Sequence, residues 1–306
     1  MSRAVVLFLA AAACGSDPTA NPDAAPSVDG PRPPDAAPHG RVELGTLDHC
    51  PDQMFVADGY LYWFTNLDER TIARTPIDAY APEEIYRDRG YVNGLQPAPG
   101  ALVWETPTAW PVRLDLSTRQ ARPLIEKDAQ IGVADGRIFA WYRESGVNHV
   151  DEIRGEVVTP FATTVQEPSW FIDGPHRLYW WDGQMHYLSV VDGSQGAFAA
   201  PTFWTTYADR TTLYAVARGS DGVSTLETWG TERYHLHDLP PAQYGAVTGG
   251  NGGPLYLLAG RTISRYDAVS DTLTPLDVGA DLIASDGAAT FLFDCAGGRT
   301  LARYYP

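Results

Sequence analysis

A short apolar strand, an Asp-Gly turn and an aromatic strand form one unit that recurs along most of this chain. Its clearest copy covers residues 56–63, with Asp58-Gly59 at the turn. Asp-Gly suits a type I′ hairpin turn because both central residues of that turn need a positive φ. The flanking residues are β-branched or aromatic, which favours strands. We therefore predict a β-hairpin here and at each related position.

Seven copies of the unit align on one strand position. The aligned residues are Tyr62, Val103, Phe139, Tyr179, Tyr214, Tyr256 and Leu292. Successive copies are about 40 residues apart, and such a period with several short strands per repeat is typical of β-propellers. A β-sandwich with regularly spaced strands is the alternative. The recurrence of one turn-and-strand signature seven times favours the propeller.

Each repeat continues past its aromatic strand into a third strand and usually a fourth. In the first copy these are residues 71–78 and 84–86. The last repeat shows only three strands, and residues 41–47 form a strand-like segment ahead of the first copy. We therefore predict an all-β fold, a seven-bladed β-propeller of four-stranded antiparallel blades. The N-terminal strand would complete the last blade and remove the free edge.

The first 40 residues differ in composition from the rest. Residues 1–13 have a positive start at Arg3, a short apolar run and small residues, which is typical of a secretory signal. The run into Cys14 resembles a bacterial lipoprotein signal, which implies cleavage before Cys14 and lipid attached to it; a plain signal peptide is the alternative. Residues 14–40 are rich in Pro, Ala and Asp, so we expect an extended, disordered tether.

Residues 41–306 have a globular composition and are assigned to the propeller. The chain has a formal net charge of −16. This argues against nucleic acid and anionic membrane surfaces as partners, because both need basic patches. We expect a monomer on the bacterial cell envelope, at the outer membrane, with the N-terminal lipid as its only membrane contact.

The first repeat also carries a family resemblance. Tyr-Trp-Phe-Thr-Asn at residues 62–66 resembles the Tyr-Trp-Thr-Asp signature of YWTD-type (LDL-receptor class B-like) propellers, and the chain is similar to propellers of tethered bacterial lipoproteins. The match is partial in the third, fourth and sixth repeats. The resemblance implies a fold and a binding scaffold and no particular chemistry. Propellers of that type usually have six blades, whereas the repeats here number seven.

Enzyme motifs are missing from the sequence. No His-Glu-x-x-His or EF-hand spacing occurs, and residues 192–196 lack one glycine of a nucleophile elbow. We therefore expect no cofactor and no metal, and a non-catalytic binding or scaffolding module. An envelope hydrolase or lyase with its site at the central channel is the alternative, by analogy with propellers that host such enzymes.

Three residue sets have both a functional and a structural interpretation. His235 and His237 resemble a metal pair on one side of a strand, and an exposed outer strand is favoured instead. The recurring aspartates resemble a catalytic or calcium ring, but Asp is common in turns; they are Asp58, Asp135, Asp173, Asp209 and Asp286. The fourth and fifth repeats are rich in aromatic residues, for which core packing is the favoured interpretation and a platform that stacks on sugars or peptides is the alternative. These residues are Trp170, Trp180, Trp181, Tyr187 and Trp204.

Two further cysteines, Cys50 and Cys295, remain in an exported chain, where disulfides persist. Cys50 follows the N-terminal strand, and Cys295 lies between the second and third strands of the last repeat. In a four-stranded blade both kinds of connection lie on one face. If the N-terminal strand completes the last blade, the two cysteines are neighbours, so we predict a disulfide that locks the ring.

The start of each innermost strand predicts a polar ring at one mouth of the channel. Positions five residues before the turn aspartates, with neighbouring ones in the less regular copies, are Gln53, Asn93, Gln130, Glu167, Trp204, Gln243 and Asp281. Amides and an aromatic suit a neutral polar ligand such as a glycan or a peptide segment, whereas the acidic surface would repel an anion. The alternative is that these side chains hydrate the channel or satisfy loop backbone.

Overall fold

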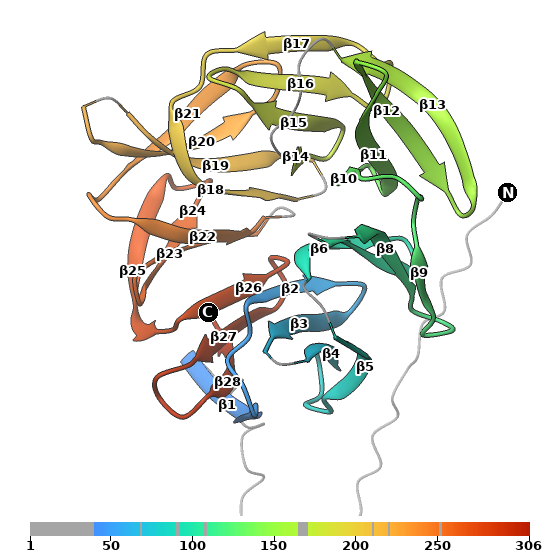
Figure 1. Ribbon diagram of the computed structural model, residues 1–306. Coiled ribbons are helices and arrows are strands. Elements are labelled where there is room, and N and C mark those ends of the chain that lie inside the picture. Colours follow the sequence, from blue (N-terminus) through green and yellow to red (C-terminus); the bar gives the residue numbers. More distant parts are fainter. Residues whose placement is uncertain are drawn as a thin grey trace, which may run out of the picture. The chain divides into compact units, whose positions relative to one another are not determined.

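The computed structural model describes eight stretches of the chain, residues 40–67, 69–89, 92–106, 109–164, 171–209, 211–219, 221–250 and 253–306. These stretches form seven four-stranded antiparallel sheets. The sheets lie around a common centre as the blades of a propeller (Figure 1), which confirms the predicted fold and the count of seven. Within the described residues, no helix has the length and hydropathy that a membrane span requires.

Six blades are continuous in sequence and run from their innermost to their outermost strand. Blades 1 and 2 are β2 (Gln53–Ala57), β3 (Tyr60–Asn66), β4 (Arg70–Pro76), β5 (Glu83–Asp88), and β6 (Asn93–Ala98), β7 (Ala101–Thr106), β8 (Ala109–Asp115), β9 (Ala121–Pro123). Blades 3 and 4 are β10 (Gln130–Ala134), β11 (Arg137–Glu144), β12 (Val147–Arg154), β13 (Val157–Thr164), and β14 (Phe171–Asp173), β15 (Arg177–Trp181), β16 (Met185–Ser189), β17 (Gln195–Phe198). Blades 5 and 6 are β18 (Thr202–Ala208), β19 (Leu213–Arg218), β20 (Ser224–Trp229), β21 (Arg233–Leu239), and β22 (Tyr244–Gly249), β23 (Leu255–Ala259), β24 (Thr262–Asp267), β25 (Thr272–Gly279).

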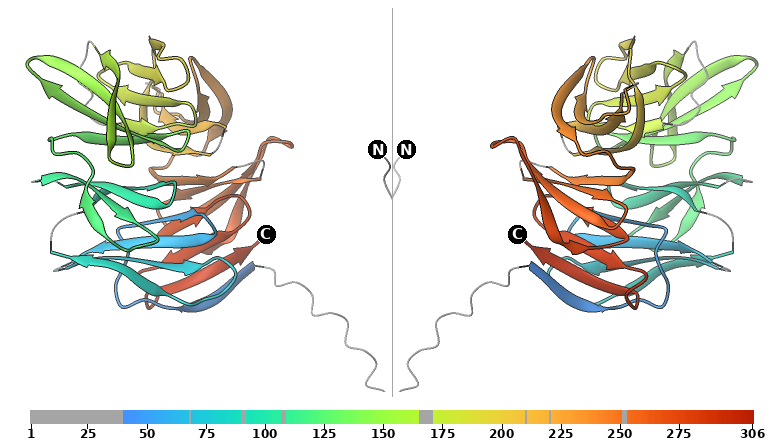
Figure 2. Two further views of the ribbon diagram at one scale, coloured as in Figure 1. Left: turned by 90° about the vertical axis from the view of Figure 1, so that its right-hand side faces the viewer. Right: turned by 90° about the vertical axis from the view of Figure 1, so that its left-hand side faces the viewer.

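Blade 7 is built from both ends of the described chain. Its strands are β26 (Leu282–Ser285), β27 (Thr290–Asp294), β28 (Thr300–Tyr305) and β1 (Gly40–Thr46). The outer strand β1 pairs with β28 from Gly40 opposite Tyr305 to Thr46 opposite Thr300, and the side views in Figure 2 show the two strands lying together. The predicted closure is therefore confirmed.

A disulfide joins Cys50 to Cys295, and their Cα atoms are 5.4 Å apart. The predicted pairing is confirmed, and the structure also shows what it connects. Cys50 lies in the connection from β1 to β2, and Cys295 lies in the turn from β27 to β28. Since strand pairing already joins β1 to β28, the disulfide fixes the segment that crosses from blade 7 to blade 1.

The hairpin turns have the predicted backbone geometry. Asp58 and Gly59 have φ values of 49° and 77°, and Asp135 is also left-handed at 53°. Positive φ at both central residues defines the type I′ turn that Asp-Gly favours. Asp209 and Asp286 instead each accept hydrogen bonds from the backbone N–H groups of the residues two and three positions later in the chain, at 2.7 to 2.9 Å. These aspartates therefore shape turns, as the structural interpretation predicted.

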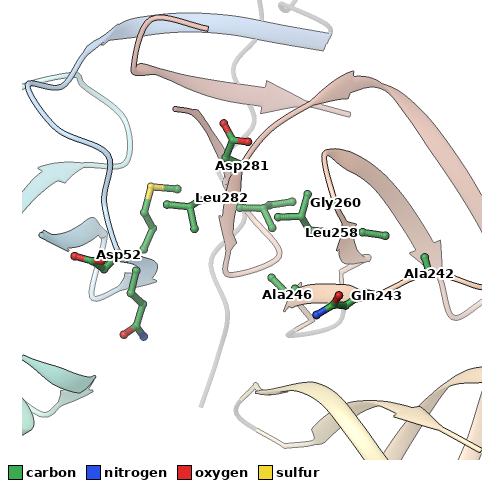
Figure 3. Close-up of a pocket in the computed structure, with 13 residues that line it drawn as sticks. Asp52, Ala242, Gln243, Ala246, Leu258, Gly260, Asp281 and Leu282 are labelled. Atoms are coloured by element: carbon green, nitrogen blue, oxygen red, sulfur yellow. The ribbon is translucent and has the colours of Figure 1, made fainter. Parts of the chain in front are cut away.

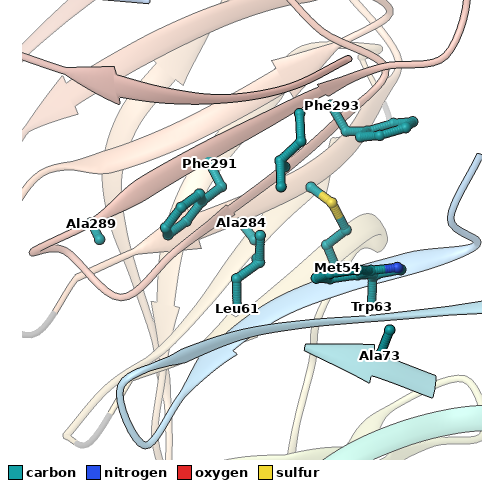
Figure 4. Packing of buried hydrophobic residues seen from close by; sticks show 9 residues of the cluster. Met54, Leu61, Trp63, Ala73, Ala284, Ala289, Phe291 and Phe293 are labelled. Carbon is teal, nitrogen blue, oxygen red and sulfur yellow. The ribbon is translucent and has the colours of Figure 1, made fainter. Parts of the chain in front are cut away.

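Each second strand is apolar along its length because neighbouring blades cover both of its faces. In β3, Leu61 and Trp63 pack against blade 7, where Phe291 and Phe293 contribute to the same cluster (Figure 4). The alternate residues Tyr62 and Phe64 belong to the cluster shared with blade 2. The core is thus a series of interfaces between blades, and each innermost strand starts on the same face of the ring.

Candidate functional site

A pocket of about 600 Å³ opens on the face where the innermost strands begin. It lies between blades 1, 6 and 7, and we call it the rim pocket. Its lining comes from the start of β2, the start of β22, the end of β23 with its following turn, and the start of β26. It is therefore built from segments that are far apart in sequence and that meet only when the ring closes.

The rim pocket combines apolar walls with a few polar groups. Met54, Leu258 and Leu282 supply apolar surface, and Figure 3 shows Leu282 between the sides that carry Asp52 and Gln243. Gln243 is exposed immediately before β22, so its amide is accessible to a ligand. An apolar cavity with a small number of polar groups is the usual form of a small-ligand site.

Asp281 forms part of the wall and is held firmly. Arg261 Nη1 lies 2.6 Å from both of its carboxylate oxygens, and the backbone N–H groups of Cys295 and Ala296 donate to it at 2.7 and 3.2 Å. Arg261 also donates to Asp294 at 2.9 Å, which lowers the pKa of that carboxyl group. The carboxylate of Asp281 therefore connects the pocket wall to the turn that contains the disulfide.

Gln53 lines the pocket edge and also connects blade 1 to blade 2. Its amide Nε2 donates to the carbonyl oxygen of Leu95 at 3.3 Å. Gln96 repeats this contact one blade further on, with its Nε2 3.4 Å from the carbonyl oxygen of Ile131. Satisfying backbone groups was the structural alternative for the rim amides, and the Gln53 contact has that character.

The other predicted rim residues that the structure describes do not line this pocket. Asn93 is exposed at the start of β6, and Gln130 is half-buried at the start of β10. Trp204 is half-buried at a β-bulge in β18 and packs against the core between blades 5 and 6, with the Arg218 guanidinium 5.5 Å from its ring centre. The structure thus brings together Gln53, Gln243 and Asp281, three of the seven predicted positions.

The lipidation site, one rim position and the aromatic group were also predicted from the sequence. Cys14, Glu167 and Trp170 lie outside the described residues. Trp180 is buried at 3% exposure, as core packing predicts, and Trp181 packs against the cluster between blades 4 and 5. The aromatic group of blades 4 and 5 therefore contributes mainly to blade interfaces.

Sequence reasoning missed the residues that leave the rim pocket open. Gly245 lines it with backbone in the ordinary φ range, and an added Cβ would meet no atom within 4 Å. Gly260 lines it from the turn after β23, with φ +58°. The available signal was the glycine at position 245, two residues after Gln243.

A catalytic site would require titratable side chains whose pKa values are shifted by their surroundings. Burial raises the pKa of Glu105, with a further increase from Asp128, while the Ile131 N–H donates to this carboxylate at 2.9 Å and opposes the rise. Arginine contacts instead lower the pKa of Glu152, to about 2. Among the described residues, no group of three or more His, Cys, Asp or Glu side chains is arranged to hold a metal.

The histidine pair has local partners. Both histidines lie on the outer strand β21. His235 Nε2 lies 3.5 Å from Asp238 of the same strand, and His237 Nδ1 lies 3.0 Å from Asp271 in the turn between β24 and β25 of blade 6. His237 also packs on the ring of Tyr266, with the centroids 5.4 Å apart. These contacts fit the interpretation of β21 as an exposed outer strand.

No protein-family model matches this sequence, and no curated protein matches it either. Solved structures do match in fold. The propeller domain of the Trilobed protease from Pyrococcus furiosus, described as having an open velcro topology, is 12% identical, with 83% of this chain and 94% of that chain covered and a TM-score of 0.61. A chain of the mitotic checkpoint complex is 11% identical, with coverage of 92% and 98% and a TM-score of 0.60.

An oligogalacturonate lyase in complex with manganese is also similar, at 11% identity, coverage of 87% and 90%, and a TM-score of 0.58. At such identities the likeness shows the fold alone. The protein is a closed seven-bladed β-propeller. Because propellers carry unrelated functions, the choice between binding and catalysis depends on the site.

Proposed function

We propose that this protein is a binding module whose ligand occupies the rim pocket. The observation that carries the proposal is the convergence of Gln53, Gln243 and Asp281 on one pocket of about 600 Å³. This volume lies within the range of small-ligand sites, and the mixture of apolar wall and sparse polar groups is typical of them. The three residues belong to or flank the innermost strands of blades 1, 6 and 7.

The ligand class follows from the polar groups. The exposed amide of Gln243 can both donate and accept hydrogen bonds, which suits hydroxyl or peptide groups. Asp52 and Asp281 place two carboxylates at the pocket in a chain of net charge −16, which disfavours anions. The ligand is therefore a neutral polar segment of a glycan or a peptide.

The pocket carboxylates favour binding over hydrolysis or elimination. Asp281 accepts from Arg261 and two backbone N–H groups, and Asp52 accepts from the Asn66 N–H at 2.6 Å. A general acid or base needs a carboxyl group that can exchange a proton with the substrate. Because Asp52 and Asp281 already accept hydrogen bonds from the protein, we assign them a structural role at the pocket wall.

We also infer that the propeller is lipid-anchored at Cys14 and related to YWTD-type propellers. The signal-like residues 1–13, the Pro-rich residues 14–40 and the Tyr-Trp-Phe-Thr-Asn motif support this, and a disulfide suits an oxidising compartment. Replacing Cys14 with Ser should release the protein from the membrane fraction of the producing cells. Unchanged partitioning would contradict the anchor.

The binding proposal is tested with Gln243→Ala and a matched control, Gln120→Ala. Both side chains are exposed, but Gln120 lies in the turn before β9 and away from the pocket. On glycan and peptide arrays, Gln243→Ala should weaken binding of the bound probe by about fivefold, the effect of losing one hydrogen bond. Gln120→Ala should bind as the wild type does. Equal binding by the two variants would contradict the proposal.

A further inference from the structure

A second pocket, of about 690 Å³, is lined by residues that precede Cys50, whereas the rim pocket is lined by residues that follow it. Residues Thr46 to His49 form one wall, and β3, β4 and β5 of blade 1 form the others. We call it the seam pocket because it opens where blade 7 meets blade 1. The disulfide fixes the segment between the two pockets, since Asp52 and Gln53 line the rim pocket.

Trp63 supplies the apolar floor of the seam pocket and one unused donor. The residue is only 6% exposed, and its ring packs in the cluster with Met54 and Phe293. Figure 4 shows the indole nitrogen at the end of the ring away from Leu61. In the described part of the chain this N–H has no hydrogen-bond partner, although it is not among the fully enclosed polar atoms. Because solvent reaches this N–H, it is available to donate a hydrogen bond to a ligand in the seam pocket.

The walls are rich in hydrogen-bond acceptors. The charged lining residues are Asp48, Glu69, Glu83, Glu84 and Arg87. Arg87 donates to Glu69 at 3.0 Å and holds both oxygens of Glu84. Because each carboxylate oxygen has two lone pairs, these groups can still accept from a ligand.

The charge around the seam pocket is close to balanced once the arginines that bind Glu83 from outside the pocket lining are counted. Glu83 accepts from Arg74 and from Arg119, each at 2.6 Å. These contacts lower the pKa of Glu83, with Arg74 as the main cause. The pocket therefore has many acceptors without a large uncompensated charge, which favours a neutral ligand that brings donors.

We propose that the seam pocket binds a neutral, hydroxyl-rich ligand, one or two sugar units in size. A hydroxyl group can donate to a wall carboxylate and accept from the Trp63 N–H, so one chemical group satisfies both. An alkylamine would leave the Trp63 N–H unpaired, and an anionic sugar would add a second negative charge to a site where four carboxylates face three arginines. This site is separate from the rim pocket and does not depend on the function proposed there.

The ligand class is tested by titrating the full chain with defined probes in a calorimeter. Glucose, galactose and N-acetylglucosamine are the neutral sugars, glucuronate is the anionic analogue, and cadaverine is the amine without an oxygen acceptor. At least one neutral sugar should bind saturably, and glucuronate and cadaverine should bind at least tenfold more weakly. Binding of glucuronate or cadaverine as tightly as the best sugar, or no binding by any sugar, would overturn the proposal.

The site is tested with Trp63→Phe and its structural counterpart Trp104→Phe. Trp104 occupies the equivalent position of β7 and is fully buried, so it reports the effect of the substitution on a blade interface alone. Trp63→Phe should weaken sugar binding about five- to tenfold, as the loss of one hydrogen bond predicts, and Trp104→Phe should leave it unchanged. Equal effects in the two variants would overturn the assignment.

Two more variants keep the test decisive. If Trp63→Phe does not fold, Thr71→Val removes a lining hydroxyl at nearly constant shape and should weaken sugar binding about threefold; unchanged affinity would overturn the proposal. Gly245→Leu, which fills the rim pocket, should leave unchanged the affinity for the sugar whose binding Trp63→Phe weakens, because Gly245 does not line the seam pocket. Loss of sugar binding in Gly245→Leu would place the sugar in the rim pocket and overturn the second site.

Discussion

Glutamine side chains join blades 1, 2 and 3 at the rim of this propeller, and we call this its closed side. The rim pocket lies between blades 6, 7 and 1, and we call this the open side. On the closed side, Gln53 and Gln96 each donate to a backbone carbonyl of the next blade. On the open side, Gly245 and the exposed Gln243 leave the rim pocket between the blades. Glutamine therefore has a structural role at Gln53 and Gln96, which bond to the next blade, and presents an exposed amide at Gln243.

Blades 6 and 7 are nevertheless joined, at the other end of their innermost strands. Thr248 Oγ1 donates to the Ser285 carbonyl at 2.8 Å and accepts from the Ser285 N–H at 2.9 Å. These residues lie near the ends of β22 and β26, whereas the pocket is at their starts. An interface held at one end can remain open at the other without losing its alignment.

The largest predicted effect on stability concerns an ion pair in blade 3, away from the rim pocket. Arg137 and Arg154 bind Glu152, whose side chain is 7% exposed, and lower its pKa to about 2. Because this pKa is lowered by folding, the stabilisation is present above the unfolded value and is lost as the pH falls towards 2. It amounts to roughly 3 kcal/mol, of which about 2 kcal/mol is lost by pH 3.

The measurement is the free energy of unfolding in urea at pH 5 and at pH 3, for the wild type and for Glu152→Gln. The wild type should lose about 2 kcal/mol more than the variant over this interval. Equal losses would show that the pair does not contribute to the pH dependence.

On the open side, Asp281→Ala is expected to be the most costly change. It removes the acceptor for Arg261 and for two backbone N–H groups beside the disulfide. The free energy of unfolding should fall by about 2 kcal/mol, since hydrogen bonds to charged groups are among the stronger ones. Asp277→Ala, at an exposed position in β25, is the control and should change it by less than about 0.5 kcal/mol. A loss as small as in that control would mean that Asp281 does not hold the pocket wall.

A smaller effect separates the two sides directly. Gln53→Ala removes one bond between blades and should cost about 1 kcal/mol of unfolding free energy. Gln243→Ala removes an exposed amide and should cost less than about 0.5 kcal/mol. Urea denaturation of both variants checks this. Equal costs would remove the distinction between a closed and an open rim.

Local chemistry explains why so much of the fold could be predicted. Asp58-Gly59 specifies a turn from two residues, and the repeat period converts such turns into blades. The disulfide followed from closure, because β1 next to β28 brings Cys50 near Cys295. Each of these features depends on sequence order and hairpin geometry, which a single chain displays.

The site could be predicted only as a ring of positions. Whether an amide reaches a carbonyl of the next blade depends on offsets of a few ångström between sheets, which no local pattern specifies. Trp204 shows this, because a bulge between Phe203 and Thr205 changes the register of β18 and places the tryptophan against the core. Gly245 was missed because its contribution is empty space.

The central claim, that the rim pocket binds the ligand, is tested most directly by filling it. Leucine at Gly245 would extend into open space beside the pocket, and Gly230→Leu makes the same change in the turn after β20, where the nearest atom to an added Cβ is 4.0 Å away. Both variants should unfold within about 2 °C of the wild type, because neither backbone is left-handed and neither site is crowded. The account predicts that Gly245→Leu loses at least tenfold in affinity for the array probe whose binding Gln243→Ala weakens, while Gly230→Leu keeps it. Full affinity in a folded Gly245→Leu variant would contradict the account.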